Sequence, residues 1–139
     1  MKRTVLMSIK PRYVKEILNG TKHFEFRRVV FDHDNVDRVI IYASSPMKRV
    51  VAEFNVDRII SDLPSKVWEE CQNFAGIDEK SFMEYFSNKS KAFSIVIKDL
   101  TIYREPINPY ESINDFRPPQ SYMYLDKRLE SVLKGILSA

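Results

Sequence analysis

The chain has 139 residues, of which 44% are hydrophobic and 12% aromatic, and a formal net charge of +3. This length and composition exclude a disordered chain and predict one globular domain spanning residues 1–139. No apolar run approaches the roughly 20 residues that a membrane span needs. The single cysteine, Cys71, excludes an internal disulfide and a multi-cysteine zinc site, and it predicts a reducing, cytoplasmic setting.

The position of the positive charge is more informative than its sum. Basic residues are concentrated in the first third of the chain: Lys2, Arg3, Lys10, Arg12, Lys15, Lys22, Arg27, Arg28, Lys48 and Arg49. Such a concentration is compatible with a nucleic-acid partner and does not require one, because a small protein also carries surplus charge for solubility.

The first elements in chain order are a strand and a helix. Residues 3–9 are predicted to form a buried strand, and Pro11 is predicted to begin a helix, where its missing N–H costs nothing. One apolar stripe marks the buried face of this helix: Tyr13, Val14, Ile17 and Leu18. Asn19-Gly20 is predicted to end the helix, since glycine readily adopts the left-handed conformation found there.

A charged strand is predicted from Thr21 to Val30. Period-two alternation places Glu25 and Arg27 on one face, toward a cleft or solvent, and Phe24 and Phe26 on the other, toward the core. Lys22 is expected at the entrance of the strand.

The rest of the chain predicts a mostly antiparallel, curled sheet or small barrel. Strands are expected at 37–44, 48–60, 92–103 and 121–125, with helices after Pro64, Asp78 and Asp126 and a long ordered loop at 105–120. In the strand at 48–60, alternation places Val51 outward, and a change of phase predicts a bulge near Lys98-Asp99. Several connections are too short for parallel crossovers, so the fold class is α+β.

The motif with chemical content is Gly20-x-Lys22-x-x-Glu25-x-Arg27. A lysine is a point-charge donor, a carboxylate accepts protons or hydrogen bonds from a base edge, and an arginine binds phosphate or a purine edge with two donors. The alternative interpretation is a solvated strand face held by a Glu25–Arg27 ion pair, which contributes little when exposed.

This motif, together with the preceding Ser-Ile-Lys-Pro segment, resembles the Gly-x-Lys-x-x-Glu-x-Arg signature of the ASCH domains. The later Tyr-Ala-Ser-Ser-Pro, Val-Ala-Glu-Phe and Pro-Pro-Gln-Ser segments also resemble positions in that family. The resemblance implies a PUA-like, mostly antiparallel β-barrel flanked by helices, with a cleft for RNA or a nucleotide.

The family resemblance leaves binding and hydrolysis open. One similar branch consists of amidohydrolases that deacylate a modified cytidine, using the motif lysine, a threonine three residues later and a downstream glutamate. Here Lys22 matches the lysine, Glu25 stands in place of the threonine, and Glu53 is the candidate glutamate. Other family members act as ribonucleases.

Two sets of site residues follow. The candidate catalytic residues are Lys22, Glu25 and Glu53. The candidate binding residues are Lys10, Arg27, Arg28, Ser44, Ser45, Gln120, Ser121 and Tyr122, although the serines and Gln120 also suit turn capping. His23 and His33 lie far apart without ligand spacing, so no metal and no cofactor is expected. RNA, a nucleotide or a modified nucleoside is the expected partner.

Overall fold

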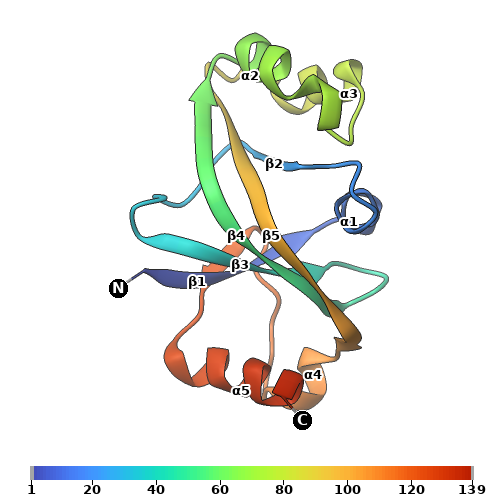
Figure 1. Cartoon of the computed structure of the whole chain (residues 1–139), viewed down its shortest axis with the longest axis vertical. Helices are drawn as coiled ribbons and strands as arrows, with labels where there is room; N and C mark the ends of the chain where they lie inside the picture. Colours follow the sequence, from blue (N-terminus) through green and yellow to red (C-terminus); the bar gives the residue numbers. More distant parts are fainter. Residues whose placement is uncertain (1, 139) are drawn as a thin grey trace.

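A computed structural model describes the backbone of residues 2–138 and the side chains of residues 2–133. Within this part of the chain, six strands form one sheet in the order β2-β5-β4-β3-β1-β6 (Figure 1). Their bounds are β1 Arg3–Ile9, β2 Phe24–Arg27, β3 Val36–Ala43, β4 Arg49–Asp62, β5 Ala92–Ile107 and β6 Tyr122–Tyr124. The pair β1–β3 is parallel and the other pairs are antiparallel, which confirms the predicted mostly antiparallel α+β fold.

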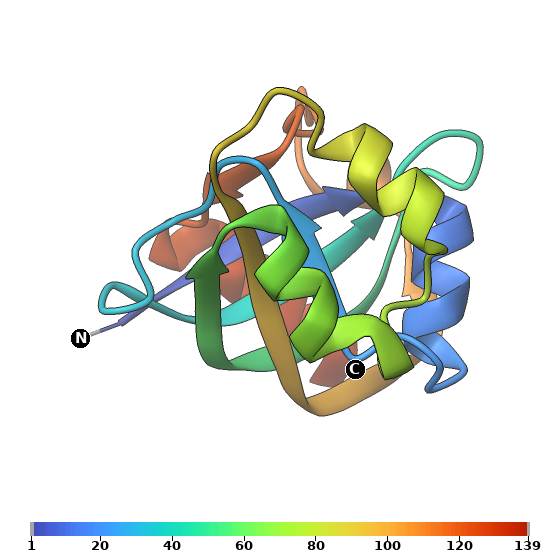
Figure 2. The same ribbon diagram turned by 90° about the horizontal axis from the view of Figure 1, so that it is seen from above.

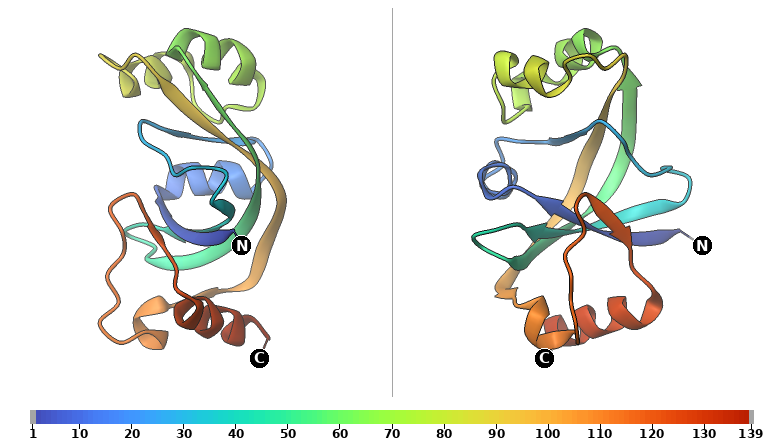
Figure 3. Two further views of the ribbon diagram at one scale, coloured as in Figure 1. Left: turned by 90° about the vertical axis from the view of Figure 1, so that its left-hand side faces the viewer. Right: turned by 180° about the vertical axis from the view of Figure 1, so that it is seen from behind.

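Helices flank this curled sheet on three sides. Helix α1, Pro11–Leu18, lies beside the sheet, while α2, Pro64–Cys71, the short 3₁₀ helix η1, Gln72–Phe74, and α3, Glu79–Tyr85, cover one end. We call the segment from α2 to α3 the cap. Helices α4, Pro109–Ser112, and α5, Lys127–Ser138, lie at the opposite end, and the long strands β4 and β5 connect the two ends (Figures 1 and 3).

The helix–turn–strand unit forms as its sequence predicts. Pro11 occupies the first turn of α1, and Val14 and Ile17 are buried under it. Gly20 has a φ of +87°, and its N–H donates to Ile17 O at 3.2 Å, which ends the helix.

Strand β2 is shorter than the predicted Thr21–Val30 at both ends, since it ends at Arg27 and its expected first residues bind elsewhere. The N–H groups of Thr21 and Lys22 both donate to Glu16 O at 3.0 Å, and Lys22 forms an isolated antiparallel bridge with Ala75. Pairing with β5 therefore begins at Phe24. The first residues of the motif thus belong to a turn held between α1 and the cap.

Register shifts in the pairing of β4 and β5 affect which side chains are buried in these strands. From the pair Glu53–Thr101 to the pair Asn55–Lys98, β4 advances by two residues and β5 by three, so β5 contains one extra residue. Asp99, within this stretch, has a φ of +52°, which confirms the predicted bulge. Val51 is 5% exposed, so its predicted outward orientation is wrong. Shifts in the pairing of this part of β4 with both neighbours interrupt the alternation that the prediction assumed.

The buried side chains of residues 2–133 form three apolar clusters. One fills the curled sheet under α1, a second lies between the sheet and α5, and a third joins Phe26 to the cap. Asp126 caps α5 as predicted, and Leu129 and Leu133 join the second cluster, whereas Ile136 and Leu137 lie outside the described side chains. The predicted loop at 105–120 instead continues β5 to Ile107 and includes α4.

Candidate functional site

A cavity of about 830 Å³ opens where α1, the cap and the ends of β1 and β3 meet. Figure 2 shows α1, α3 and the turn between β3 and β4 on the same side of the sheet. The segment at 118–120 completes the wall, and the Ser8 hydroxyl fixes it by donating to Pro119 O at 2.6 Å. Segments from most of the chain therefore meet around one space.

Lys22 lies deep in this cavity and is 3% exposed. Its Nζ donates to Ala75 O at 2.7 Å and lies 4.4 Å from the centre of the Phe26 ring and 5.3 Å from that of Tyr13. Gly76, with a φ of +66°, packs against the lysine stem so closely that a Cβ there would lie 2.5 Å from Lys22 Cβ. The segment at 75–76 thus fixes the lysine in place.

Burial lowers the pKa of Lys22 to about 8, although the nearby Glu25 carboxylate opposes the shift by favouring the charged form. At neutral pH the group is therefore mostly a cation, with an appreciable neutral fraction slightly above it. Such a lysine can donate hydrogen bonds in both states and can accept a proton when neutral.

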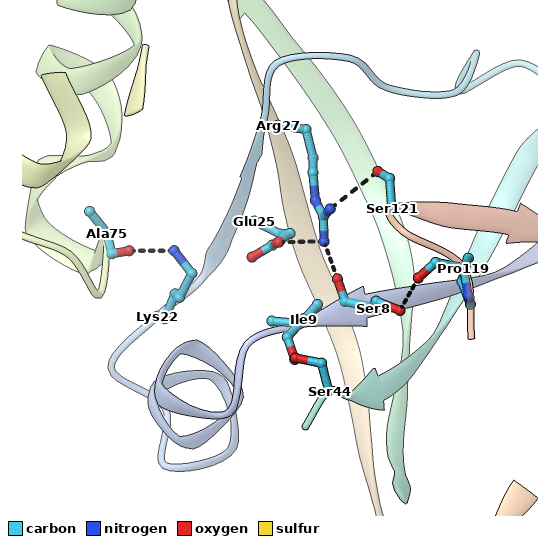
Figure 4. Close-up of polar contacts among 9 residues, drawn as sticks. All are labelled: Ser8, Ile9, Lys22, Glu25, Arg27, Ser44, Ala75, Pro119 and Ser121. Carbon is cyan, nitrogen blue, oxygen red and sulfur yellow. Dashed lines mark hydrogen bonds and ion pairs between the residues drawn. The ribbon is translucent and has the colours of Figure 1, made fainter. Parts of the chain in front are cut away.

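Glu25 and Arg27 form a nearly buried ion pair. Glu25 Oε2 lies 2.9 Å from an Arg27 guanidinium nitrogen, and the two side chains are 7% and 11% exposed. Figure 4 shows Glu25 between Lys22 and Arg27, so a carboxylate separates two cations along the wall. This pair is not the exposed, weak type that the alternative interpretation assumed.

The Arg27 guanidinium also connects strands that are not hydrogen-bonded neighbours in the sheet. It donates to Ser8 O at 2.8 Å and to the Ser121 hydroxyl at 3.3 Å (Figure 4). Strand β2 is one end of the sheet, whereas Ser8 belongs to β1 and Ser121 precedes β6 at the other end. Arg27 therefore holds the two ends of the curled sheet together beside the cavity.

A pair of tyrosine hydroxyls also belongs to the cavity, and sequence reasoning missed it. The hydroxyls of Tyr42 and Tyr110 lie 2.8 Å apart, and both residues line the cavity. Burial, followed by the hydrogen bond with Tyr110, raises the pKa of Tyr42, so this hydroxyl stays protonated. Tyr42 lies in an apolar strand and Tyr110 in a predicted loop, so no sequence spacing connects them.

The charged residues at the opening of the cavity, its mouth, are exposed to solvent, whereas Lys22 and Glu25 at its buried end, the floor, are nearly inaccessible. Lys10, Arg12 and Lys48 line the cavity and are exposed, as are Ser45 and Gln120. Among the described lining residues, five are basic (Lys10, Arg12, Lys22, Arg27, Lys48) and two are acidic (Glu25, Glu84).

The structure brings seven of the predicted site residues to the cavity and leaves four outside its lining: Lys10, Lys22, Glu25, Arg27, Ser44, Ser45 and Gln120 line it, whereas Arg28, Glu53, Ser121 and Tyr122 do not. The expected meeting of Lys22 with Glu53 does not occur. Glu53 instead accepts a hydrogen bond from Tyr103 at 3.1 Å and pairs with Arg38 at 3.4 Å.

The other three outlying residues have structural partners. Arg28 donates to Tyr85 O at 2.7 Å and stacks on the Tyr85 ring, which ties β2 to the cap. Ser121 accepts from Arg27, and Tyr122 packs edge-on against Phe31.

Within the described residues, no cluster of three or more potential metal-ligating side chains occurs, and no helix is long and apolar enough to cross a membrane.

The family model of the ASCH domain matches residues 7–110. The chain belongs to the ASCH domain family. A curated relative, an ASCH domain-containing ribonuclease of Zymomonas mobilis, is 27% identical over 143 residues, covering 99% of this chain and 94% of the relative. The crystal structure of ASCH from Zymomonas mobilis superposes on this ASCH domain with a TM-score of 0.87, covering 96% of this chain and 95% of that one at 27% identity.

Another relative carries a similar segment in a longer protein. The large ribosomal subunit protein uL22 of Ureaplasma parvum is 27% identical over 126 residues, covering 88% of this ASCH domain and 39% of that protein. The fold predicted from the family resemblance is confirmed by the ASCH structure from Zymomonas mobilis, a chain of comparable length.

Proposed function

We propose that this ASCH domain binds RNA and holds one nucleotide in its cavity. The observation that carries the proposal is a cavity of about 830 Å³ whose lining contains five basic and two acidic side chains. That volume lies in the range of sites for small ligands, and a surplus of cations attracts a phosphodiester chain. The name of the Zymomonas mobilis relative, a ribonuclease, also supports an RNA partner.

Titration of labelled single-stranded RNA at 50 and 200 mM salt tests this function. Affinity is expected to fall as salt rises, because phosphate contacts release counterions. Lys48→Gln is expected to weaken RNA binding and to reduce its salt dependence. The matched variant Lys127→Gln, in α5 at the end of the molecule opposite the cap, is expected to leave both the affinity and the salt dependence unchanged. Undetectable or salt-independent binding contradicts the proposal.

A second candidate function is cleavage of RNA. It is favoured by the 27% identity to a protein named a ribonuclease and by a buried lysine whose pKa is about 8. In cleavage by transesterification, the 2′-hydroxyl loses its proton and attacks the adjacent phosphorus, and the 5′ oxygen leaves with a proton. Lys22 and the Tyr42–Tyr110 hydroxyls are cavity groups able to exchange those protons, and this role for Lys22 requires the scissile phosphate at the floor of the cavity.

Incubation of short RNAs and of N4-acetylcytidine with wild type and Lys22→Ala separates the hydrolytic alternatives. RNA cleavage that the substitution abolishes supports a ribonuclease. Deacetylation is not expected, because Glu53 lies outside the cavity and Glu25 replaces the threonine of the amidohydrolase pattern. Absence of turnover on both substrates leaves binding as the function.

A further inference from the structure

The cavity separates its charges by depth. At the floor, Lys22 and Glu25 are 3% and 5% exposed, and Phe26 is 7% exposed. At the mouth, the cations Lys10, Arg12 and Lys48 lie at solvent-exposed positions, together with the carboxylate of Glu84. A ligand that carries a phosphate and a base therefore meets two different environments.

The floor is unsuited to a phosphate. Three of the five N–H donors of Arg27 are engaged, by Glu25, Ser8 O and Ser121, and its Nε is buried with no hydrogen-bond partner among the described residues. Turning the terminal nitrogens toward an anion would therefore break the connection between the ends of the sheet. A phosphate beside Lys22 would also lie near the Glu25 carboxylate, and repulsion between like charges is strong where water is excluded.

The same floor offers both a donor and an acceptor. Lys22 Nζ has three protons, and one of them goes to Ala75 O. Glu25 uses Oε2 for Arg27, and no described residue donates a hydrogen bond to its Oε1. A neighbouring donor and acceptor match the Watson–Crick edge of an unpaired base, which carries both kinds of group. The rings of Phe26 and Tyr13 beside Lys22 add apolar surface for a flat ligand.

We propose that the cavity receives an unpaired base at its floor, against Lys22 and Glu25, while the phosphates stay at the mouth with Lys10, Arg12 and Lys48. This inference rests on the proposed RNA binding and specifies its substrate class, a single-stranded segment from which one base is unstacked. Duplex RNA presents no free Watson–Crick edge and is excluded. The motif lysine and glutamate thus recognise a base, and cations outside the motif bind the backbone.

Competition against a labelled single-stranded RNA hexamer, using wild-type protein, tests the orientation. Each of the four ribonucleosides is added separately, and ribose 5-phosphate, inorganic phosphate and an RNA duplex serve as the other arms. At least one nucleoside is expected to displace the RNA with little dependence on salt, whereas the phosphate compounds and the duplex displace it at least tenfold less effectively. Displacement by ribose 5-phosphate or inorganic phosphate, but by no nucleoside, overturns the orientation and leaves RNA binding standing. Absence of RNA binding removes the proposed function itself.

Glu25→Gln gives opposite predictions for the two orientations. With a base at the floor, replacing the charged acceptor by a neutral one weakens nucleoside binding by about tenfold. With a phosphate at the floor, removal of the negative charge strengthens the binding of ribose 5-phosphate. Lys48→Gln is the control at the mouth: it should weaken a nucleoside monophosphate several-fold and leave the nucleoside unchanged. Thermal unfolding of each variant establishes that binding is measured on folded protein, and tighter phosphate binding by Glu25→Gln contradicts the proposal.

Discussion

Replacement of Gly76 by alanine measures how tightly the cap holds the motif lysine. The added Cβ would lie 2.5, 2.7 and 2.8 Å from Lys22 Cβ, Cγ and Cδ, closer than the 3.0 Å that real Cβ contacts respect. The lysine stem has little room to retreat, because the residue is 3% exposed and its Nζ is bonded to Ala75 O.

The expected loss combines two costs. A non-glycine residue at positive φ costs about 1–2 kcal/mol, and forcing extra volume into a packed site costs about 1–3 kcal/mol. The lower entropy of the unfolded alanine chain offsets roughly 0.4–1 kcal/mol. Gly76→Ala should therefore destabilise the protein by about 2–4 kcal/mol, which lowers the Tm by roughly 10 °C in a domain of this size.

Gly20→Ala is the matched control for this experiment. Gly20 also has a positive φ, +87°, but its added Cβ would meet nothing within 4 Å. Urea unfolding should give a loss of about 1 kcal/mol for Gly20→Ala, and the excess at Gly76 reports the contact with Lys22. Gly76→Ala should also weaken RNA binding. Equal losses for the two variants would refute the reasoning that Gly76 fixes the lysine.

Three other variants test separate parts of the structure. Glu53→Gln should cost about 1–2 kcal/mol of stability, because it weakens the contacts of this carboxylate with Tyr103 and Arg38. RNA affinity should stay unchanged, and weaker RNA binding would show that Glu53 does contribute to the site. Arg27→Lys should cost about 2–4 kcal/mol in urea unfolding, because an ammonium cannot serve Glu25, Ser8 and Ser121 together, and an unchanged midpoint would contradict the bridging role. The pKa of Lys22 is about 8 in the folded chain against 10.5 ordinarily, so the unfolded chain binds more protons between these values and this group adds stability as pH rises through that window. Compared with Lys22→Met, which cannot titrate, wild type should therefore gain about 3 kcal/mol between pH 8 and 10.5, and a constant difference would show that the lysine pKa is not depressed.

The sequence predicted much of the local structure. Helix α1 follows from Pro11, its apolar stripe and Gly20, and the bulge near Asp99 follows from a change of phase. These features depend on neighbours a few residues apart, for which spacing and backbone preference are sufficient.

What the sequence could not predict depends on contacts between distant segments. Lys22 was expected at the mouth of a strand and is buried, because Ala75 and Gly76, some 53 residues away, cross over it. Glu53 shares a strand with core residues of the predicted pattern, but its carboxylate contacts Arg38 and Tyr103, on the neighbouring strands, and does not meet Lys22. Neither outcome has a signature in local spacing.

The placement of the cap within the chain affects how the cavity can change in evolution. The cap lies inside the connection from β4 to β5, whose pairing continues to Asp62 and Ala92, so residues 63–91 form an insertion between two adjacent strands. Loop-closure entropy grows slowly, by about 0.6 kcal/mol for each doubling of length. The insertion supplies Ile77, Ser81, Glu84 and Tyr85 to the cavity wall. Changes confined to residues 77–91 can therefore alter ligand preference while the strand pairings, and the contacts of Ala75 and Gly76 with Lys22, remain unchanged.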